Sequence, residues 1–184
     1  MRPSSYLCIL ICALFIGLVS YPAMADLKKA QWQDVENVDA LTKKYPFFNA
    51  PINNAIEETE GGDSAISISY ARVELTPEKN LFLLQIYHSL YCGAVSGCTT
   101  IAYLEDIKAK KVSKVYNVQL PGDVYGGLCE NNPVMVAQLP EPGGSIDTQG
   151  YRTFPMGADG KLHLGQFFPT LEAVDTCAPV SQDD

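Results

Sequence analysis

The chain has little positive charge. Its 184 residues include 13 lysines and arginines against 21 aspartates and glutamates, which gives a formal net charge of −8 at pH 7 with the histidines neutral. Nucleic acids and anionic membrane surfaces are bound through a basic face, and this composition argues against both as partners. It favours a cationic protein as partner, although an acidic surface is also an ordinary route to solubility.

No apolar run is long enough for a typical membrane-spanning helix. The run from Tyr6 to Val19 covers about fourteen residues, whereas a spanning helix needs roughly 20. It follows a basic residue and precedes Pro22, with small residues at Ala23 and Ala25. This order is typical of a secretory signal peptide cleaved after Ala25. An uncleaved membrane anchor is the alternative.

The signal peptide predicts the compartment and the domain organisation. Residues 1–25 would be removed, and residues 26–184 would form a single exported globular domain located in the periplasm, with no membrane attachment after cleavage. We find neither an internal repeat nor a linker that would divide this domain. The sequence leaves the oligomeric state open.

The sequence also lacks a catalytic signature. Ser96 lies between Val95 and Gly97, so the glycine spacing of a nucleophile elbow is not met. The exported part has two histidines, His88 and His163, and a zinc site that used His88 and the nearby cysteines would need a distant fourth ligand. We therefore predict no catalytic residue, no metal site and no cofactor, with an unrecognised hydrolase as the alternative.

Four cysteines remain after the signal peptide. An even number in an exported chain indicates disulfides, and four cysteines allow three connectivities. Two strands joined by a short loop would bring Cys92 and Cys98 within bonding distance, which favours that pair. Cys129 with Cys177 then follows by elimination.

Two short helices are predicted at the start of the exported domain. Trp32, Val35, Val38 and Leu41 recur every three residues, which predicts an amphipathic helix that ends before Tyr45-Pro46. The second helix is expected to begin at a capping Asn49 with Pro51 in its first turn, and to end at Gly61-Gly62. Its apolar face would bury Ile52, Ala55 and Ile56.

The rest of the chain reads as strands. The run from Leu81 to Tyr87 is apolar on both faces, which predicts a central strand, with a buried helix segment as the alternative. Val73 and Leu75 are out of phase with the alternation before them, which indicates a bulge. Proline and glycine fill residues 121–127 and 140–150, so we expect loops there. The other predicted strands are Ser64–Leu75, Thr99–Glu105, Val112–Leu120, Val134–Leu139, Tyr151–Met156 and Lys161–Phe168.

The predicted fold class is therefore α+β and mainly β. Two short N-terminal helices would precede one antiparallel sheet of six or seven strands, cross-linked by disulfides.

The most distinctive stretch is HSLYCGAVSGCTT, residues 88–100. Small residues contribute little to a core and offer neither an acid nor a base, yet their backbone can approach another surface closely. We predict that a bridged loop binds a protein partner, with Tyr87, Tyr91 and Tyr103 as an aromatic rim. A hairpin end closed only to protect a sheet edge is the alternative. The predicted binding residues are Tyr91, Gly93, Ala94, Val95, Ser96 and Gly97.

The region from Leu81 to Leu104 resembles the Ivy-type periplasmic lysozyme inhibitors. The resemblance rests on a strand, Cys92, a short loop, Cys98 and a second strand. In that family the cysteine-bracketed loop enters the active site of the enzyme and carries a histidine, where this chain has small residues. Periplasmic immunity proteins against wall-degrading amidases likewise fill a catalytic cleft.

The resemblance implies a periplasmic protein that inhibits or neutralises a basic exported hydrolase, either lysozyme-like or an amidase toxin. The alternative is a module that binds a small ligand or serves envelope assembly, without catalytic activity.

Overall fold

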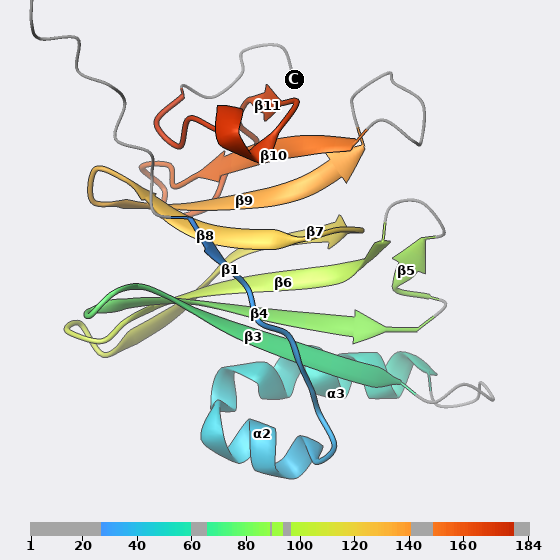
Figure 1. The fold of residues 1–184 in the computed structure, drawn as a ribbon. Coiled ribbons are helices and arrows are strands. Elements are labelled where there is room, and N and C mark those ends of the chain that lie inside the picture. Colours follow the sequence, from blue (N-terminus) through green and yellow to red (C-terminus); the bar gives the residue numbers. More distant parts are fainter. Residues whose placement is uncertain (1–26, 60–65, 89, 94–96, 141–148, 179–184) are drawn as a thin grey trace, which may run out of the picture.

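The fold is seen in a computed structural model that describes residues 27–59, 66–88, 90–93, 97–140 and 149–178 (Figure 1). The predicted signal peptide, residues 1–25, lies outside these residues. None of the helices in the described part of the chain is long and apolar enough to cross a membrane.

Two antiparallel sheets make up most of the described chain (Figure 1). The first has the strand order β1-β8-β9-β10-β11. Its strands span Lys28–Lys29, Val124–Cys129, Asn132–Pro140, Gln149–Pro155 and Phe167–Phe168. The second has the order β2-β3-β4-β6-β5, and β7 also pairs with β6. Its strands span Gln33–Asp34, Ser67–Thr76, Lys79–Tyr87, Gly97–Asp106, Cys92–Gly93 and, for β7, Lys111–Leu120.

The fold is thus mainly β and antiparallel, as predicted, but the single sheet predicted was wrong. Alternation of apolar and polar residues tells which side chains point inward. It does not tell which of two facing sheets a strand joins, because both present the same pattern to a shared core.

The helices cover the face of the second sheet that lies away from the first sheet (Figure 1). They comprise α2 (Val38–Lys44), the 3₁₀ turn η1 (Pro46–Phe48) and α3 (Asn49–Thr59). Because η1 leads directly into α3, the helical part is one run of 14 residues beside the short α2, not the two short helices predicted. In α3 Ile52 and Ala55 are buried, but Ile56 is 38% exposed.

The first helix begins later than predicted. Trp32 precedes a short strand, Gln33–Asp34, and packs against the core between the sheets. The helix starts at Val38, where the side chain of Asn37 accepts a hydrogen bond of 2.9 Å from the backbone N–H of Ala40. This cap, rather than the spacing of apolar residues, fixes the start of the helix.

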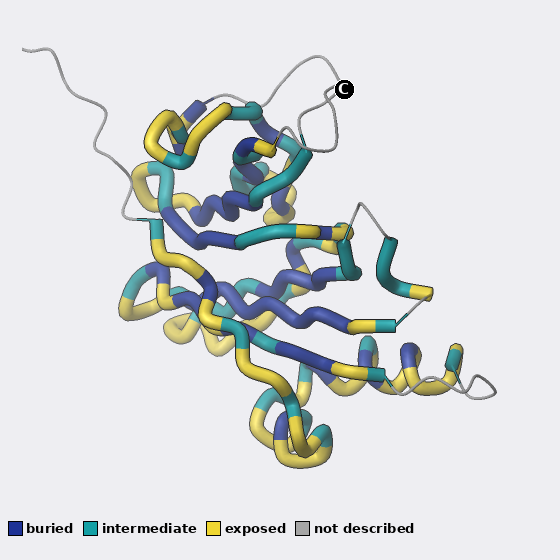
Figure 2. Tube along the Cα trace, turned by 45° about the vertical axis from the view of Figure 1, so that its right-hand side comes forward, coloured by how far each residue is buried: buried dark blue, intermediate teal, exposed yellow. Residues whose placement is uncertain are grey.

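The predicted central strand is confirmed: β4 lies between β3 and β6 and is buried on both faces. Leu81 and Leu83 belong to the core between the sheets. The alternate residues pack against the helices: Phe82, Leu84 and Ile86. Buried residues accordingly concentrate on the central strands (Figure 2).

The change of phase within β3 also arises because the second sheet has a buried cluster on each of its two faces. Ile68 belongs to the helix-side cluster, whereas Val73 and Leu75 belong to the core between the sheets. A register shift does occur, but it lies between Glu74 and Thr76. The phase therefore changes because different layers cover the two ends of the strand.

A strand was missed where a loop was predicted, because Val124–Cys129 forms β8. A Cβ atom at Gly126 would lie 2.8 Å from side-chain atoms of both Val73 and Leu75 on the second sheet. Glycine is needed here because the two sheets approach each other closely. Gly126 therefore marks that approach and not a turn, whereas Gly127 lies against the side chain of Leu27.

The N-terminal segment joins the two sheets. Lys28 pairs with Gly126 of β8, and Gln33 pairs with Tyr70 of β3. Between them the buried Ala30 donates its N–H to the carbonyl of Val124 at 2.8 Å. One open side of the sandwich is thereby closed.

The C-terminal segment covers the outer face of the first sheet. Leu171 and Val174 pack against a cluster that contains Tyr125 and Val136. The predicted strand from Lys161 to Phe168 is reduced to the pairing of Phe167–Phe168 with β10 and a bridge between Met156 and Leu162.

Both predicted disulfides are confirmed: Cys92 is bonded to Cys98, and Cys129 to Cys177. The second bond links the end of β8 to the C-terminal segment. Beside it the hydroxyl of Thr176 donates to the carbonyl of Leu128 at 2.9 Å. The Cys129–Cys177 disulfide therefore holds the C-terminal segment on the first sheet.

The two disulfides should differ in their contribution to the free energy of unfolding. They close rings of sequence separation 6 and 48, for which chain entropy gives roughly 2 and roughly 4 kcal/mol. Urea unfolding of the exported domain should therefore show a larger loss for C129S/C177S than for C92S/C98S. Equal losses, or a larger loss for C92S/C98S, would contradict this assignment.

Candidate partner-binding site

β4 and β5 lie end to end along the same side of β6. The chain between them leaves the ladder in a turn. Ile86 pairs with Thr99, and Cys92 pairs with the next residue of β6, Cys98. The chain between these two pairs has five residues, 87–91, that have no counterpart on β6. We call this segment the excursion.

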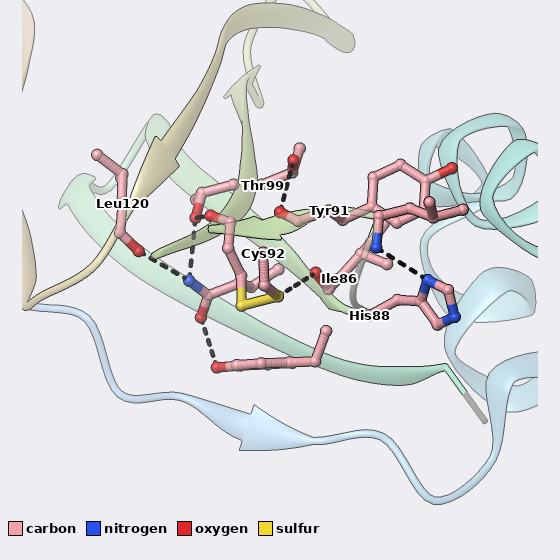
Figure 3. Close-up of a disulfide and its surroundings, with 11 residues drawn as sticks. Ile86, His88, Tyr91, Cys92, Thr99 and Leu120 are labelled. Carbon is pink, nitrogen blue, oxygen red and sulfur yellow. Dashed lines mark hydrogen bonds between the residues drawn. A yellow bond between two sulfur atoms is a disulfide. The ribbon is translucent and has the colours of Figure 1, made fainter. Parts of the chain in front are cut away.

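Backbone hydrogen bonds close the excursion into a turn. The N–H groups of Tyr91 and Cys92 both donate to the carbonyl of His88, each at 2.9 Å. The backbone N–H and the hydroxyl of Thr99 donate to the carbonyl of Tyr91 at 2.8 and 3.1 Å (Figure 3). At the base of the turn the sulfur of Cys92 lies 3.6 Å from the carbonyl oxygen of Ile86. The chain thus leaves the sheet and returns to it at a fixed place.

The disulfide lies directly after the excursion (Figure 3). Cys92 and Cys98 are paired residues of β5 and β6, and Gly93 and Gly97 form the next pair. The hairpin therefore has a two-pair ladder with a covalent bond at its base. Of the predicted binding residues, the structure places Tyr91, Gly93 and Gly97 here. The remaining ones lie outside the described residues: Ala94, Val95 and Ser96.

Gly97 has a reason within the fold for being glycine. Its φ of +76° is a conformation that side chains with a Cβ rarely adopt. A Cβ atom would also lie 2.2 Å from the carbonyl oxygen of Leu120, which belongs to the backbone of β7. The hairpin is thereby packed against β7 on one side.

The excursion is attached to α3 through a side-chain hydrogen bond. The phenol of Tyr91 donates to the carboxylate of Glu58. This hydrogen bond, together with desolvation and the charge of Glu58, raises the pKa of Tyr91 from 10.0 to about 12. The helix therefore holds the base of the disulfide hairpin.

Two of the three predicted rim tyrosines lie at this site. Tyr87 is 38% exposed, and Tyr91 is partly exposed. Tyr103 is only 6% exposed and packs against Phe48 with a centroid distance of 5.6 Å, so its assignment to the rim was wrong. An aromatic residue on a strand was read as a contact residue, whereas the 3₁₀ turn covers it.

A buried amide supports the base of the excursion. The side-chain N–H of Gln85 donates to the hydroxyl of Thr100 at 3.2 Å and to the carbonyl of Leu120 at 3.3 Å. The phenol of Tyr87 donates to the side-chain oxygen, Oε1, of Gln85 at 2.5 Å. Buried polar groups that satisfy each other in this way fix side-chain positions, so Tyr87 is held where the strand ends.

Each of the two histidines has a hydrogen-bond partner close to it in sequence. His163 is hydrogen-bonded to Asp159 at 2.9 Å, and Nδ1 of His88 accepts the N–H of Leu90 at 3.2 Å. Nε2 of His88 is buried without a hydrogen bond. Within the described ranges, no group of three or more histidine, cysteine, aspartate or glutamate side chains could hold a metal ion.

The charge around the hairpin is one-sided. Residues 45–71 and 80–107 contain no lysine or arginine. These stretches include α3, most of β4, β5 and β6. Glu57 and Glu58 are both exposed on α3. The nearest lysines in sequence lie at the hairpin turns at the other end of the strands, namely Lys79 and Lys108 (Figure 1).

Sequence reasoning found the bridged loop but missed the excursion and its attachment to the helix. Leu90 is 65% exposed and forms part of the excursion. One signal was available, since an apolar strand that ends at Tyr87 leaves four residues before Cys92, too many for an uninterrupted ladder. The contact with Glu58 joins residues 33 positions apart and has no local signal.

In comparisons with known proteins, no family model, no curated protein and no solved structure matches this chain. The resemblance to lysozyme inhibitors is therefore untested by these comparisons and stays a prediction.

Replacement of Gly97 by alanine should destabilise the protein by at least about 2 kcal/mol, because it combines an unfavourable φ with a clash against the backbone of β7. Gly160→Ala is the matched control. It has a similar φ of +73° but nothing within 4 Å of the added Cβ, so about 1 kcal/mol is expected. Urea denaturation measures both. Similar losses for the two variants would show that the clash with β7 is absent.

The hydrogen bond from Tyr91 should be visible in a pH titration. Because the pKa in the folded protein lies above 10.0, this contribution to stability is complete below pH 10 and is lost as the pH rises towards about 12. Carbon NMR of the phenol ring, assigned by Tyr91→Phe, should give this midpoint in the wild type. Glu58→Gln should return it towards 10.0. An unchanged midpoint in Glu58→Gln would argue against the bond.

Proposed function

We propose that this protein binds and inhibits a basic exported cell-wall hydrolase, with the disulfide-bracketed loop of residues 93–97 placed in the catalytic cleft of that enzyme. The observation that carries the proposal is the attachment of the hairpin. The Cys92–Cys98 bond closes its base, and the Tyr91–Glu58 hydrogen bond fixes that base on α3.

A loop held in this way suits inhibition. Binding costs roughly 0.5 to 1.5 kcal/mol for each side chain that must be immobilised, and this cost falls when the loop is ordered before contact. Covalent closure at Cys92 and Cys98 restricts the loop in the free protein. The tight packing of Gly97 against Leu120 restricts one of its two strands further.

The distribution of charge supports a basic partner. The elements that carry the loop lack lysine and arginine over residues 45–71 and 80–107, while Glu57 and Glu58 are exposed beside it. An acidic surface of this kind would steer a basic enzyme towards the loop and speed association at low ionic strength. Increased salt should slow association for the same reason.

The predicted periplasmic location indicates the class of enzyme. An exported protein that binds another protein in that compartment meets enzymes that cut the cell wall, among them lysozymes and amidases. The local resemblance of Leu81 to Leu104 to lysozyme inhibitors points the same way. A module for a small ligand or for envelope assembly is the alternative, and it requires no basic partner.

The proposal is tested with the tagged exported domain, residues 26–184. The domain should slow peptidoglycan hydrolysis by a lysozyme or an amidase chosen from a purified panel. Replacing Val95 by Asp and Ser96 by Lys together should then weaken binding at least about tenfold, because both side chains would have to enter the cleft. Isothermal titration calorimetry measures the affinity, and the melting temperature should not change.

Ala109→Asp is the matched control, since it adds a charge to an exposed hairpin turn at the other end of the strands. It should leave inhibition intact. If V95D/S96K binds the enzyme as tightly as the wild type, the loop does not enter the cleft. If no enzyme in the panel is inhibited and a lipid or sugar co-purifies with the domain, the alternative function is favoured.

A further inference from the structure

A pocket of about 490 Å³ lies beside the second sheet, at the end where β4 passes into the excursion. Asp34 and Val35 line it from the end of β2, Ile66–Ser69 line it from the start of β3, and Tyr87 lines it from the end of β4. Three segments distant in sequence thus converge on it. Its volume lies within the range of roughly 300 to 1,000 Å³ that is typical of ligand sites.

The face of the pocket that Asp34 shares combines hydroxyl groups with an aromatic ring. Val35, Ile66 and Ile68 border the pocket, but their side chains pack with the helix-side cluster. Ser67, Ser69 and Tyr87 lie on the other face of β3 and β4. Tyr87 is 38% exposed, and its phenol is held by Gln85, so the ring lies in a fixed place. An aromatic ring can cover the methylene groups of a long side chain, and its face attracts a cation.

Asp34 is the charged residue among those that line the pocket. Its Oδ1 accepts the hydroxyl of Ser69 at 2.6 Å, which orients the carboxylate and leaves Oδ2 to accept from a ligand.

The neighbouring lysines are engaged elsewhere. Lys29 forms an ion pair with Asp123 at 2.5 Å, and Lys28 donates to the carbonyl of Glu74 at 2.7 Å. The carboxylate at the pocket is therefore not neutralised by either of them.

We propose that this pocket binds a lysine or arginine side chain of a protein partner. The methylene groups would lie against the ring of Tyr87, and the cation would meet the carboxylate of Asp34. A carboxylate ligand would face Asp34 with like charge. A purely apolar ligand would gain nothing from that carboxylate.

The position of the pocket connects it to the disulfide hairpin. Tyr87 is the last residue of β4 and the first residue of the excursion. A basic enzyme that takes the loop would thus present a cationic residue to Asp34 at a second point of contact. The inference rests on the proposed function in this respect alone, that the side chain belongs to the same partner.

The test uses a peptide probe and does not require the partner. The isotope-labelled exported domain is titrated with acetyl-Ala-Lys-Ala-amide and, separately, with the same peptide carrying norleucine in place of lysine. Amide resonances are followed up to about 10 mM peptide, which covers a dissociation constant near 1 mM. The lysine peptide should shift the resonances of Ser67, Ser69 and Tyr87 in a saturable manner, and the norleucine peptide should not.

Asp34→Asn is the decisive variant, because the asparagine oxygen can still accept the hydroxyl of Ser69 while the charge is lost. It should weaken binding of the lysine peptide at least about fivefold. Glu36→Gln is the matched control, since this carboxylate is two residues away and does not line the pocket. It should leave the affinity unchanged.

The pocket is not a cation site if the lysine peptide gives no saturable shift, if norleucine binds equally well, or if Asp34→Asn binds as the wild type does. These outcomes are distinct from failure of the proposed function, which is judged by V95D/S96K and enzyme inhibition. A peptide that binds at Asp34 while V95D/S96K still inhibits would retain the pocket and reject the loop.

Discussion

Burial of β4 on both faces is the constraint on which the rest of the structure depends. Leu81 and Leu83 bind the first sheet to the second, and Phe82 and Leu84 bind the helices to the same strand. Each such side chain contributes roughly 1.5 to 3 kcal/mol when fully buried. All three layers therefore meet at one strand, and its register against β6 cannot shift by one residue without exchanging the two apolar sets.

This fixed register explains the geometry of the candidate site. The five extra residues between Ile86 and Cys92 cannot be absorbed by sliding β4, so they have no counterpart on β6. The disulfide with Cys98 then returns the chain to β6, and the Tyr91–Glu58 contact ties the excursion to α3. The same helix that covers the core thus also orients the hairpin.

The elements that the sequence predicted correctly are those whose cause is local. The two-sided apolar run of β4 and the cysteine spacing of the hairpin carry their own explanation. The errors arise where residues distant in sequence determine the structure or the burial of a segment. Gly126 marks the close approach of Val73 and Leu75, which no local pattern reveals. Asn37 caps a helix in the middle of an apolar repeat of three, after a strand that ends at Asp34. Tyr103 became a core residue because Phe47 and Phe48 cover it.

In the candidate site, too, the features with a local cause could be predicted and those that depend on distant residues could not. The bridged loop could be predicted, because two cysteines around small residues are visible in the sequence. The pocket could not, because Asp34, Ser69 and Tyr87 meet only when β2 and β4 lie on either side of β3. The same arrangement makes one end of the second sheet polar. Ser69 and Gln85 lie there on the face that carries Ala71 and Leu83 further along the strands. Where the two sheets no longer cover each other, the same strands that build the core present hydroxyl, amide and carboxylate groups. An acidic, polar sheet end beside a covalently closed hairpin is the chemistry that a basic protein surface would meet.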